Sequence, residues 1–251
     1  MFGSAVIFFL ITLAGCACGS APANSSEENQ VIRFSRGLSD TLRTRDRRAM
    51  VDRQIRRRGV SDERVLKALE EVPRHWFVPE DQRGRAYDDY PLPIGYDQTI
   101  SQPYIVGLMT ELLKPSPGDT VLEIGTGSGY QAAVLSRVVD KVYSIEIVEP
   151  LCKRARSILN EQGYGNVEVR CGDGYDGWPE HAPFAGIILT AAPEKVPQPL
   201  LDQLADGGRL VVPEGRYNQD LVVYEKQGGE IRRREVIPVR FVPMTGKAEE
   251  K

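Results

Sequence analysis

The spacing of apolar residues predicts three helices in the first half of the chain. Residues 44–58 form the first, which Gly59 ends, and Ser61 caps a second with an apolar face made of Val65, Leu66, Leu69 and Val72. Pro103 suits the first position of the third helix, whose apolar face is made of Ile105, Leu108, Met109 and Leu112. Residues 74–94, rich in Pro, Tyr and Asp, are expected to be irregular.

From residue 119 onward, short apolar runs typical of buried strands alternate with helical segments. The predicted strands are "TVLEIG", "KVYSIEIV", "VEVRCGD", "FAGIILTAA" and "RLVVPEG". The predicted helices between them are "YQAAVLSRVV", "PLCKRARSILNEQG" and "PQPLLDQLADGG". This alternation predicts an α/β fold with a mostly parallel sheet and helices on both faces. The later segment "DLVVYEKQGGEIRRREVIPVRFV" predicts an antiparallel hairpin joined through Gly228 and Gly229.

A length of 251 residues suits one α/β domain with an N-terminal addition. We predict an extension over residues 1–43, a domain over 44–246 and a tail over 247–251. Within the domain, the helical part occupies 44–118 and the sheet 119–246. The net charge of −3 argues against a dedicated nucleic-acid binder, and the arginines before residue 59 are expected to form a solvated helical face.

The first residues form a short apolar run, residues 5–14, followed by "LAGC" at Leu13 to Cys16. The run is too short to span a bilayer. Its end resembles the lipobox of bacterial lipoproteins, in which Cys16 would carry a lipid anchor. A secretory signal normally carries Lys or Arg before its apolar run, and this chain has neither there. A gene start placed too early, with Met50 as the true initiator, is therefore the alternative, and residues 20–29 are expected to be linker.

Cysteine and histidine are too sparse to predict a metal site. His75 and His181 are the only histidines, and no Cys/His cluster has ligand spacing. Cys152 and Cys171 fall in a predicted helix and strand, and we expect them to be buried free thiols.

A glycine-rich loop, "LEIGTGSGY", lies between a predicted strand and helix. Gly125, Gly127 and Gly129 allow close approach of the backbone to a ligand, and the helix start offers free N–H groups. The spacing is G-x-G-x-G, whereas a dinucleotide fingerprint has its third glycine where this chain has Tyr130. No Gly-Lys-Ser/Thr follows, so the P-loop pattern also fails, and a purely structural turn remains the alternative.

Two acidic residues at strand ends extend this pattern. Glu146 ends the second strand, 21 residues after Gly125, where a carboxylate can accept both ribose hydroxyls. Asp173 follows the third strand, where it can face an adenine edge. Together with the terminal hairpin, the loop and the two acids resemble the S-adenosylmethionine site of class I methyltransferases. The resemblance implies S-adenosyl-L-methionine as cofactor, S-adenosyl-L-homocysteine as product, and no metal.

The resemblance narrows to one family. "TISQPY", "LEIGTGSGYQAA", "GDGYDGW", "FAGIILTAAP" and "VRFVPMTG" follow one another as in protein-L-isoaspartate O-methyltransferases, and the similarity covers residues 44–246. It implies methylation of the α-carboxylate of L-isoaspartyl residues in damaged proteins, which starts repair through a succinimide. It also implies a monomer whose partners are isoaspartyl-containing proteins and peptides, with no nucleic acid and no membrane required. Cofactor supply favours the cytoplasm over an envelope lipoprotein anchored at Cys16.

The resemblance also implies residue roles. Ser101 is the catalytic residue that holds the substrate carboxylate, and Thr245 closes the site beside it. The expected cofactor-binding residues are Gln98, Thr99, Ile100, Glu123, Gly125, Gly127, Ser128, Glu146, Asp173, Gly174 and Thr245. Residues 190–193 border the substrate channel, which Ala192 and Pro193 line. Some family members have a cofactor-contacting His where this chain has Val106, so no contact is assigned there.

The chemistry explains why a serine suffices at position 101. A carboxylate is already ionised at pH 7, so methyl transfer needs alignment and exclusion of water rather than a strong base. With Pro103 as first helical residue, Gln102 is the cap and the Ser101 hydroxyl is free to face the cofactor loop. Two alternatives stay open: a class I methyltransferase with another substrate, and an exported, non-catalytic binding protein. The glycine spacing excludes a dehydrogenase, and Ser128 does not lie in the G-x-S-x-G of a serine hydrolase.

Overall fold

The computed structural model describes residues 43–249. Their first part is helical over residues 43–50 and continues as η1, Val51–Ile55, and η2, Arg56–Arg58. Gly59 then ends the helix in the left-handed conformation, with φ of 101°. The predicted first helix is confirmed, with a π turn and a 3-10 turn at its end. Residues 1–42, which include the predicted lipobox and linker, lie outside the described part.

The second helix, α2, spans Glu63–Glu71, and its cap is Asp62 rather than Ser61. The Asp62 side chain accepts a hydrogen bond from the Arg64 backbone N–H at 2.9 Å. The Ser61 N–H instead donates to the Glu111 carboxylate at 2.6 Å. This hydrogen bond joins the segment before α2 to the third helix. The third helix, α3, spans Pro103–Leu113, with Gln102 at its cap position as predicted.

The segment expected to be irregular contains more structure than its composition suggests. It forms η3, Arg74–Trp76, and η4, Glu80–Arg85, and then β1, Leu92–Gly95, pairs antiparallel with β2, Gln98–Ile100. Tyr96 and Asp97 make the two-residue turn with φ of 55° and 56°. Neither residue is glycine, so the sequence lacks the usual hairpin signal, and the hairpin was missed.

The main sheet has seven strands in the order β5-β4-β3-β6-β7-β8-β9. The strands are β3, Thr120–Ile124; β4, Lys141–Glu146; β5, Val167–Cys171; β6, Phe184–Leu189; β7, Leu204–Glu214; β8, Gln219–Gln227; and β9, Glu230–Val239. The first five are parallel, and β8 and β9 are antiparallel to their neighbours. The predicted fold class is confirmed. Because the chain moves outward from β3 to β5 and returns to β6 beside β3, a crevice opens at the strand ends there.

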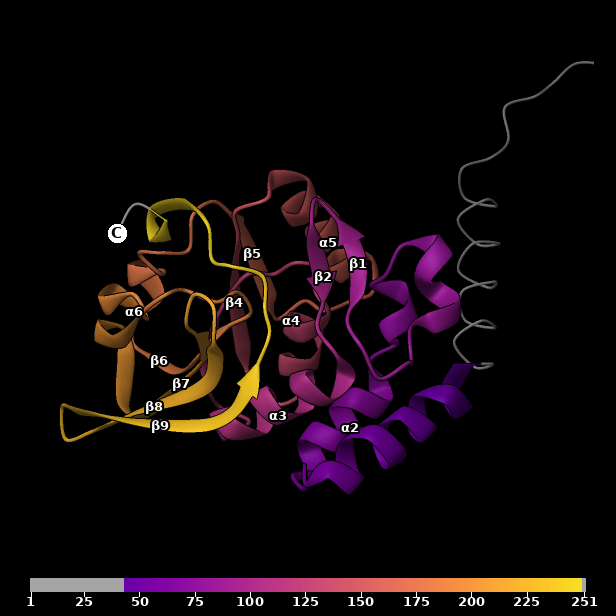
Figure 1. The fold of residues 1–251 in the computed structure, drawn as a ribbon, viewed down its shortest axis with the longest axis horizontal. Helices are drawn as coiled ribbons and strands as arrows, with labels where there is room; N and C mark the ends of the chain where they lie inside the picture. The colour runs from indigo at the N-terminus through magenta and orange to yellow at the C-terminus, as the bar shows by residue number, and fades with distance from the viewer. Residues whose placement is uncertain (1–42, 250–251) are drawn as a thin grey trace, which may run out of the picture. The chain divides into compact units, whose positions relative to one another are not determined.

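Helices cover both faces of the sheet (Figure 1). The helices α4, Tyr130–Leu135, and α5, Glu149–Glu161, join α2 and α3 in one apolar layer, whereas α6, Gln198–Asp202, packs on the opposite face. Alternate strand residues enter the two layers: Val121 faces α4, and Leu122 faces α6. The helices α4 and α6 are shorter than predicted. After Leu135 the backbone N–H groups of Arg137 and Val138 bond three residues back, as in a tighter turn, and residues after 203 join β7.

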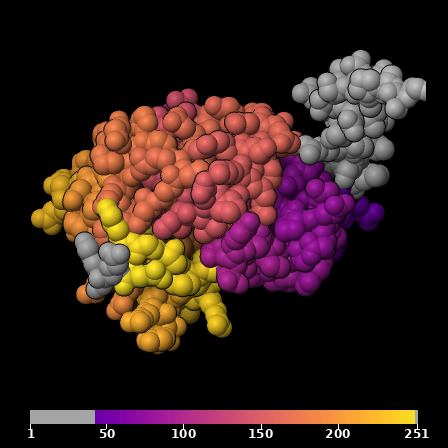
Figure 2. Space-filling view, turned by 90° about the horizontal axis from the view of Figure 1, so that it is seen from above, coloured from indigo at the N-terminus to yellow at the C-terminus, as the bar shows by residue number. Residues whose placement is uncertain are grey.

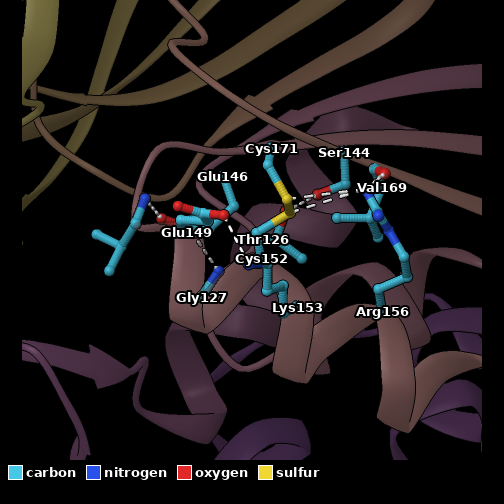
Figure 3. Close-up of a disulfide and its surroundings, with 11 residues drawn as sticks. Thr126, Gly127, Ser144, Glu146, Glu149, Cys152, Lys153, Arg156, Val169 and Cys171 are labelled. Atoms are coloured by element: carbon cyan, nitrogen blue, oxygen red, sulfur yellow. Dashed lines mark hydrogen bonds and ion pairs between the residues drawn. A yellow bond between two sulfur atoms is a disulfide. The ribbon is translucent and has the colours of Figure 1, made fainter.

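Cys152 and Cys171 form a disulfide, so the prediction of free thiols was wrong. Cys152 lies on α5 and Cys171 ends β5, and their Cα atoms are 5.5 Å apart. The two residues are separated by 19 positions, and only the packing of α5 against β5 brings them together. Figure 3 shows the bond beside Glu146.

Residues Leu42–Lys251 form one compact unit, and the finer domain limits stay a prediction. Within residues 43–249, no helix has the length and apolar character to cross a membrane.

Candidate active site

A cavity opens at the carboxyl ends of β3, β4, β5 and β6. Eleven predicted site residues line it: Gln98, Thr99, Ile100, Ser101, Gly125, Gly127, Ser128, Glu146, Asp173, Gly174 and Thr245. Their elements are far apart in the sequence, and the strand order brings them together. Their contacts with a bound molecule stay a prediction.

The glycine loop between β3 and α4 needs glycine at Gly125. This residue has φ of 97°, and a Cβ there would lie 2.4 Å from the Thr190 hydroxyl oxygen. The Thr190 side chain comes from the end of β6 and also lines the cavity. The loop backbone is therefore held close to β6. It is also tied to β4, because the Gly125 and Thr126 N–H groups both donate to the Ile145 carbonyl. At Gly174, which also lines the cavity, a Cβ would lie 2.5 Å from the Ile124 side chain and would force it to move.

Glu146 is 5% exposed and organises the middle of the cavity. One carboxylate oxygen accepts a hydrogen bond from the Gly127 N–H at 2.7 Å, and the other accepts one from the Val148 N–H at 2.8 Å (Figure 3). Burial raises the pKa of Glu146, and the backbone N–H groups act in the opposite direction. Each oxygen keeps a further lone pair, so the group can still accept hydroxyls from a ligand.

Asp173 connects the cavity to the C-terminal segment. Its carboxylate accepts hydrogen bonds from the Tyr175 N–H and the Lys247 N–H, both at 2.9 Å. A Cβ at Gly246 would lie 2.5 Å from the same carboxylate, so only glycine allows this approach. The Lys247 ammonium also pairs with Asp176. Lys247 was assigned to a tail outside the domain, yet it fastens this segment over the cavity.

Three predicted site residues do not line the cavity. Glu123 is completely buried behind the glycine loop, where Ser144 donates a hydrogen bond to its carboxylate, and burial raises its pKa to about 8. Its predicted role as a cofactor-binding residue does not match this position. Ala192 exchanges backbone hydrogen bonds with Val242 and Met244 and so anchors the C-terminal segment, and Pro193 lies beyond it.

Ser101 lies at the boundary of two hollows. It lines the cavity described above and also a neighbouring cleft of about 490 Å³. The cleft lies between residues 237–242 on one side and the start of α3, including Tyr104, together with Arg58 on the other. Figure 2 shows the yellow C-terminal segment on the surface beside the purple N-terminal part. Val106 also lines the first cavity, although no contact had been assigned to it.

A glycine loop after the first central strand, with acidic residues after the next two, in a parallel sheet closed by an antiparallel hairpin, defines a class I S-adenosylmethionine-dependent methyltransferase. Comparison with known proteins identifies the family. The family model described as protein-L-isoaspartate(D-aspartate) O-methyltransferase matches residues 45–249, so the chain belongs to this family, as predicted.

Individual relatives agree with this result. A protein-L-isoaspartate O-methyltransferase from Gloeobacter violaceus is 56% identical over 78% of this chain and 97% of its own length. A relative of the same name, numbered 2, from Syntrophobacter fumaroxidans is 49% identical over 96% of this chain and 95% of its own length. A solved structure of a protein-L-isoaspartate O-methyltransferase, 32% identical, covers 80% of this chain and 67% of its own, with a TM-score of 0.74.

Proposed function

We propose that this protein transfers a methyl group from S-adenosyl-L-methionine to the α-carboxylate of L-isoaspartyl residues in damaged proteins. The family supports the activity, and one observation supports the site. Ser101 is shared by a narrow cavity built around the glycine loop and by an open cleft that can admit a polypeptide segment. A methyl donor in the cavity and a carboxylate entering from the cleft would meet at this residue.

The residues present fit the cofactor. Gly125 and Gly174 line the cavity, and a Cβ at either position would collide with Thr190 or Ile124 and shift the cavity wall. We assign the methionine part of the cofactor to the loop at Gly127 and Ser128, the ribose hydroxyls to Glu146 and the adenine edge to Asp173. Glu123 supports this arrangement from behind through Ser144, whose hydroxyl also lies 2.6 Å from that of Thr126.

When bound, the cofactor supplies an electrophilic methyl on a sulfonium. The protein contributes by positioning the substrate carboxylate against that methyl group. The substrate carboxylate is already ionised, so no group has to remove a proton. The Ser101 hydroxyl donates a hydrogen bond to it and holds it in line with the methyl, and the segment fastened by Asp173 and Lys247 excludes water. Ester formation then allows the neighbouring backbone nitrogen of the substrate to attack the ester carbonyl and close a succinimide, with methanol as the leaving group.

A pair of peptides tests this function. Both have the same sequence, and one contains an L-isoaspartyl and the other a normal aspartyl residue. Transfer of labelled methyl is expected only to the first, and equal transfer to both would refute the assignment. Ser101→Ala should lower turnover by about 100-fold through loss of alignment. Its affinity for S-adenosylhomocysteine, measured by calorimetry, should stay within twofold, and near-normal turnover would contradict the role of Ser101.

We propose that the protein acts as a monomer in the cytoplasm, where the cofactor is supplied. The Cys152–Cys171 disulfide favours the envelope alternative, because disulfides persist mainly in oxidising compartments. Cell fractionation with mass spectrometry of the mature N-terminus decides between them. A lipid on Cys16 establishes the envelope protein, and an unmodified Met1 or a start at Met50 establishes the cytoplasmic one.

A further inference from the structure

Arg74 is a buried cation in the helical part of the protein. It begins η3, directly after α2 and Pro73, and its side chain is fully buried. Its Nε donates to the Ala86 carbonyl at 2.8 Å, and one Nη donates to the Ser101 carbonyl at 2.8 Å. Its guanidinium carbon lies 4.9 Å from the centre of the Tyr130 ring. The guanidinium thus touches the backbone of the residue that we place at the reacting carboxylate.

No carboxylate balances this charge within residues 43–249. Arg74 forms no ion pair there, and its other Nη has no hydrogen-bond partner. Burial lowers the pKa of Arg74 to about 10, which still leaves it protonated at neutral pH. Burying a cation without a counter-ion is costly. Two backbone carbonyls need only a neutral donor, so packing and hydrogen bonding alone do not explain why a charged side chain stands here.

The missing anion has an obvious source in the proposed reaction. Ser101 borders both the cavity and the cleft, and Tyr130, under the guanidinium, also lines the cavity. A substrate carboxylate bound at the Ser101 hydroxyl would lie on the far side of that residue from Arg74. In buried surroundings two opposite charges attract over such a distance far more strongly than in water.

We infer that Arg74 is a positioning residue for the substrate carboxylate: it fixes the backbone of Ser101 and supplies the buried positive charge that draws the carboxylate to it. This inference rests on the proposed function. It also predicts opposite effects on the two reactants, because the substrate carboxylate is an anion and the sulfonium of the methyl donor is a cation.

The test compares Arg74→Gln, which keeps a hydrogen-bond donor and loses the charge, with Arg74→Lys, which keeps the charge. For an isoaspartyl peptide with neutral flanking residues, Arg74→Gln should raise KM about tenfold. That is the scale for unit charges roughly 10 Å apart at an effective dielectric constant of about 20. The KM for S-adenosylmethionine should stay unchanged or fall. In Arg74→Lys the peptide KM should stay within about threefold of the unchanged protein.

Arg47→Gln is the matched control. Arg47 is 4% exposed, lies in the same helical part, and bonds to the Glu70 carbonyl and the Tyr87 hydroxyl, without contact to Ser101. Its replacement should lower the melting temperature and leave the peptide KM unchanged.

Three results would overturn the inference: an unchanged peptide KM in Arg74→Gln, a parallel rise of both KM values, or a tenfold rise in Arg74→Lys. If Arg74→Gln does not fold, Arg74→Lys alone decides by the same threefold and tenfold limits. Failure of the proposed function is a separate outcome, since the unchanged protein would then show no preference for the isoaspartyl peptide.

Discussion

Breaking the bond between Cys152 and Cys171 should lower the free energy of unfolding by about 3 kcal/mol. The bond closes a loop with a sequence separation of 19 residues, and this figure is the chain entropy that such a loop removes from the unfolded state. For a domain of this size, the loss corresponds to a fall in melting temperature of roughly 6–12 °C. The change is made by replacing both cysteines with alanine, since Cys152 is fully buried and has no room for a larger residue.

Thermal unfolding of the original protein and the double variant, each with and without a reductant, measures this contribution. The reductant should destabilise the original protein and leave the double variant unchanged. Because the double variant keeps Cys16 and Cys18, this comparison also tests whether reduction at those two cysteines affects stability. The affinity for S-adenosylhomocysteine below the transition should change less than threefold, because Glu146 and Asp173 keep their own backbone hydrogen bonds. A melting temperature within about 2 °C of the original would refute the reasoning.

Other predictions concern single groups of the site. Glu123 is protonated in the folded protein up to a pKa of about 8 and ionises near 4.5 when unfolded, so stability should fall as pH rises from 5 to 8. In Glu123→Gln, the change in the free energy of unfolding between pH 5 and 8, measured by urea titration, should be smaller by a few kcal/mol than in the original protein. An unchanged pH profile would contradict this prediction. Glu146→Gln should weaken S-adenosylhomocysteine binding at least tenfold by calorimetry, because a charged acceptor is lost. Arg58 and Arg240 line the cleft, so an isoaspartyl peptide with acidic flanking residues should have a lower KM than a neutral one. Replacing both arginines with Gln should remove this difference, whereas Arg57→Gln should not, and an unchanged difference in the double variant would contradict the prediction.

The local signals in the sequence determined most of the fold. Short apolar runs located every strand of the main sheet, because the parallel strands are buried on both faces, and the segments between them and the period of 3.6 located the helices α2 to α6. Glycine, proline and acidic residues at strand ends identified the cavity in the same way. Helix ends were less certain because caps depend on partners: Glu111, fifty residues away, binds Ser61 and leaves Asp62 to cap α2.

Contacts between distant segments were decided only by the tertiary structure. The pairing of Cys152 with Cys171, the hold of Lys247 on Asp173 and the hydrogen bond from Arg74 to Ser101 each join segments with no shared pattern. Glu123 illustrates the limit most clearly. The family resemblance assigned it to the cofactor, but it lies within β3 and is completely buried behind the loop. Sequence patterns therefore determined which elements form and what chemistry they carry. The packing of those elements decided which side chains reach the cavity, because direction and distance in space are not encoded locally.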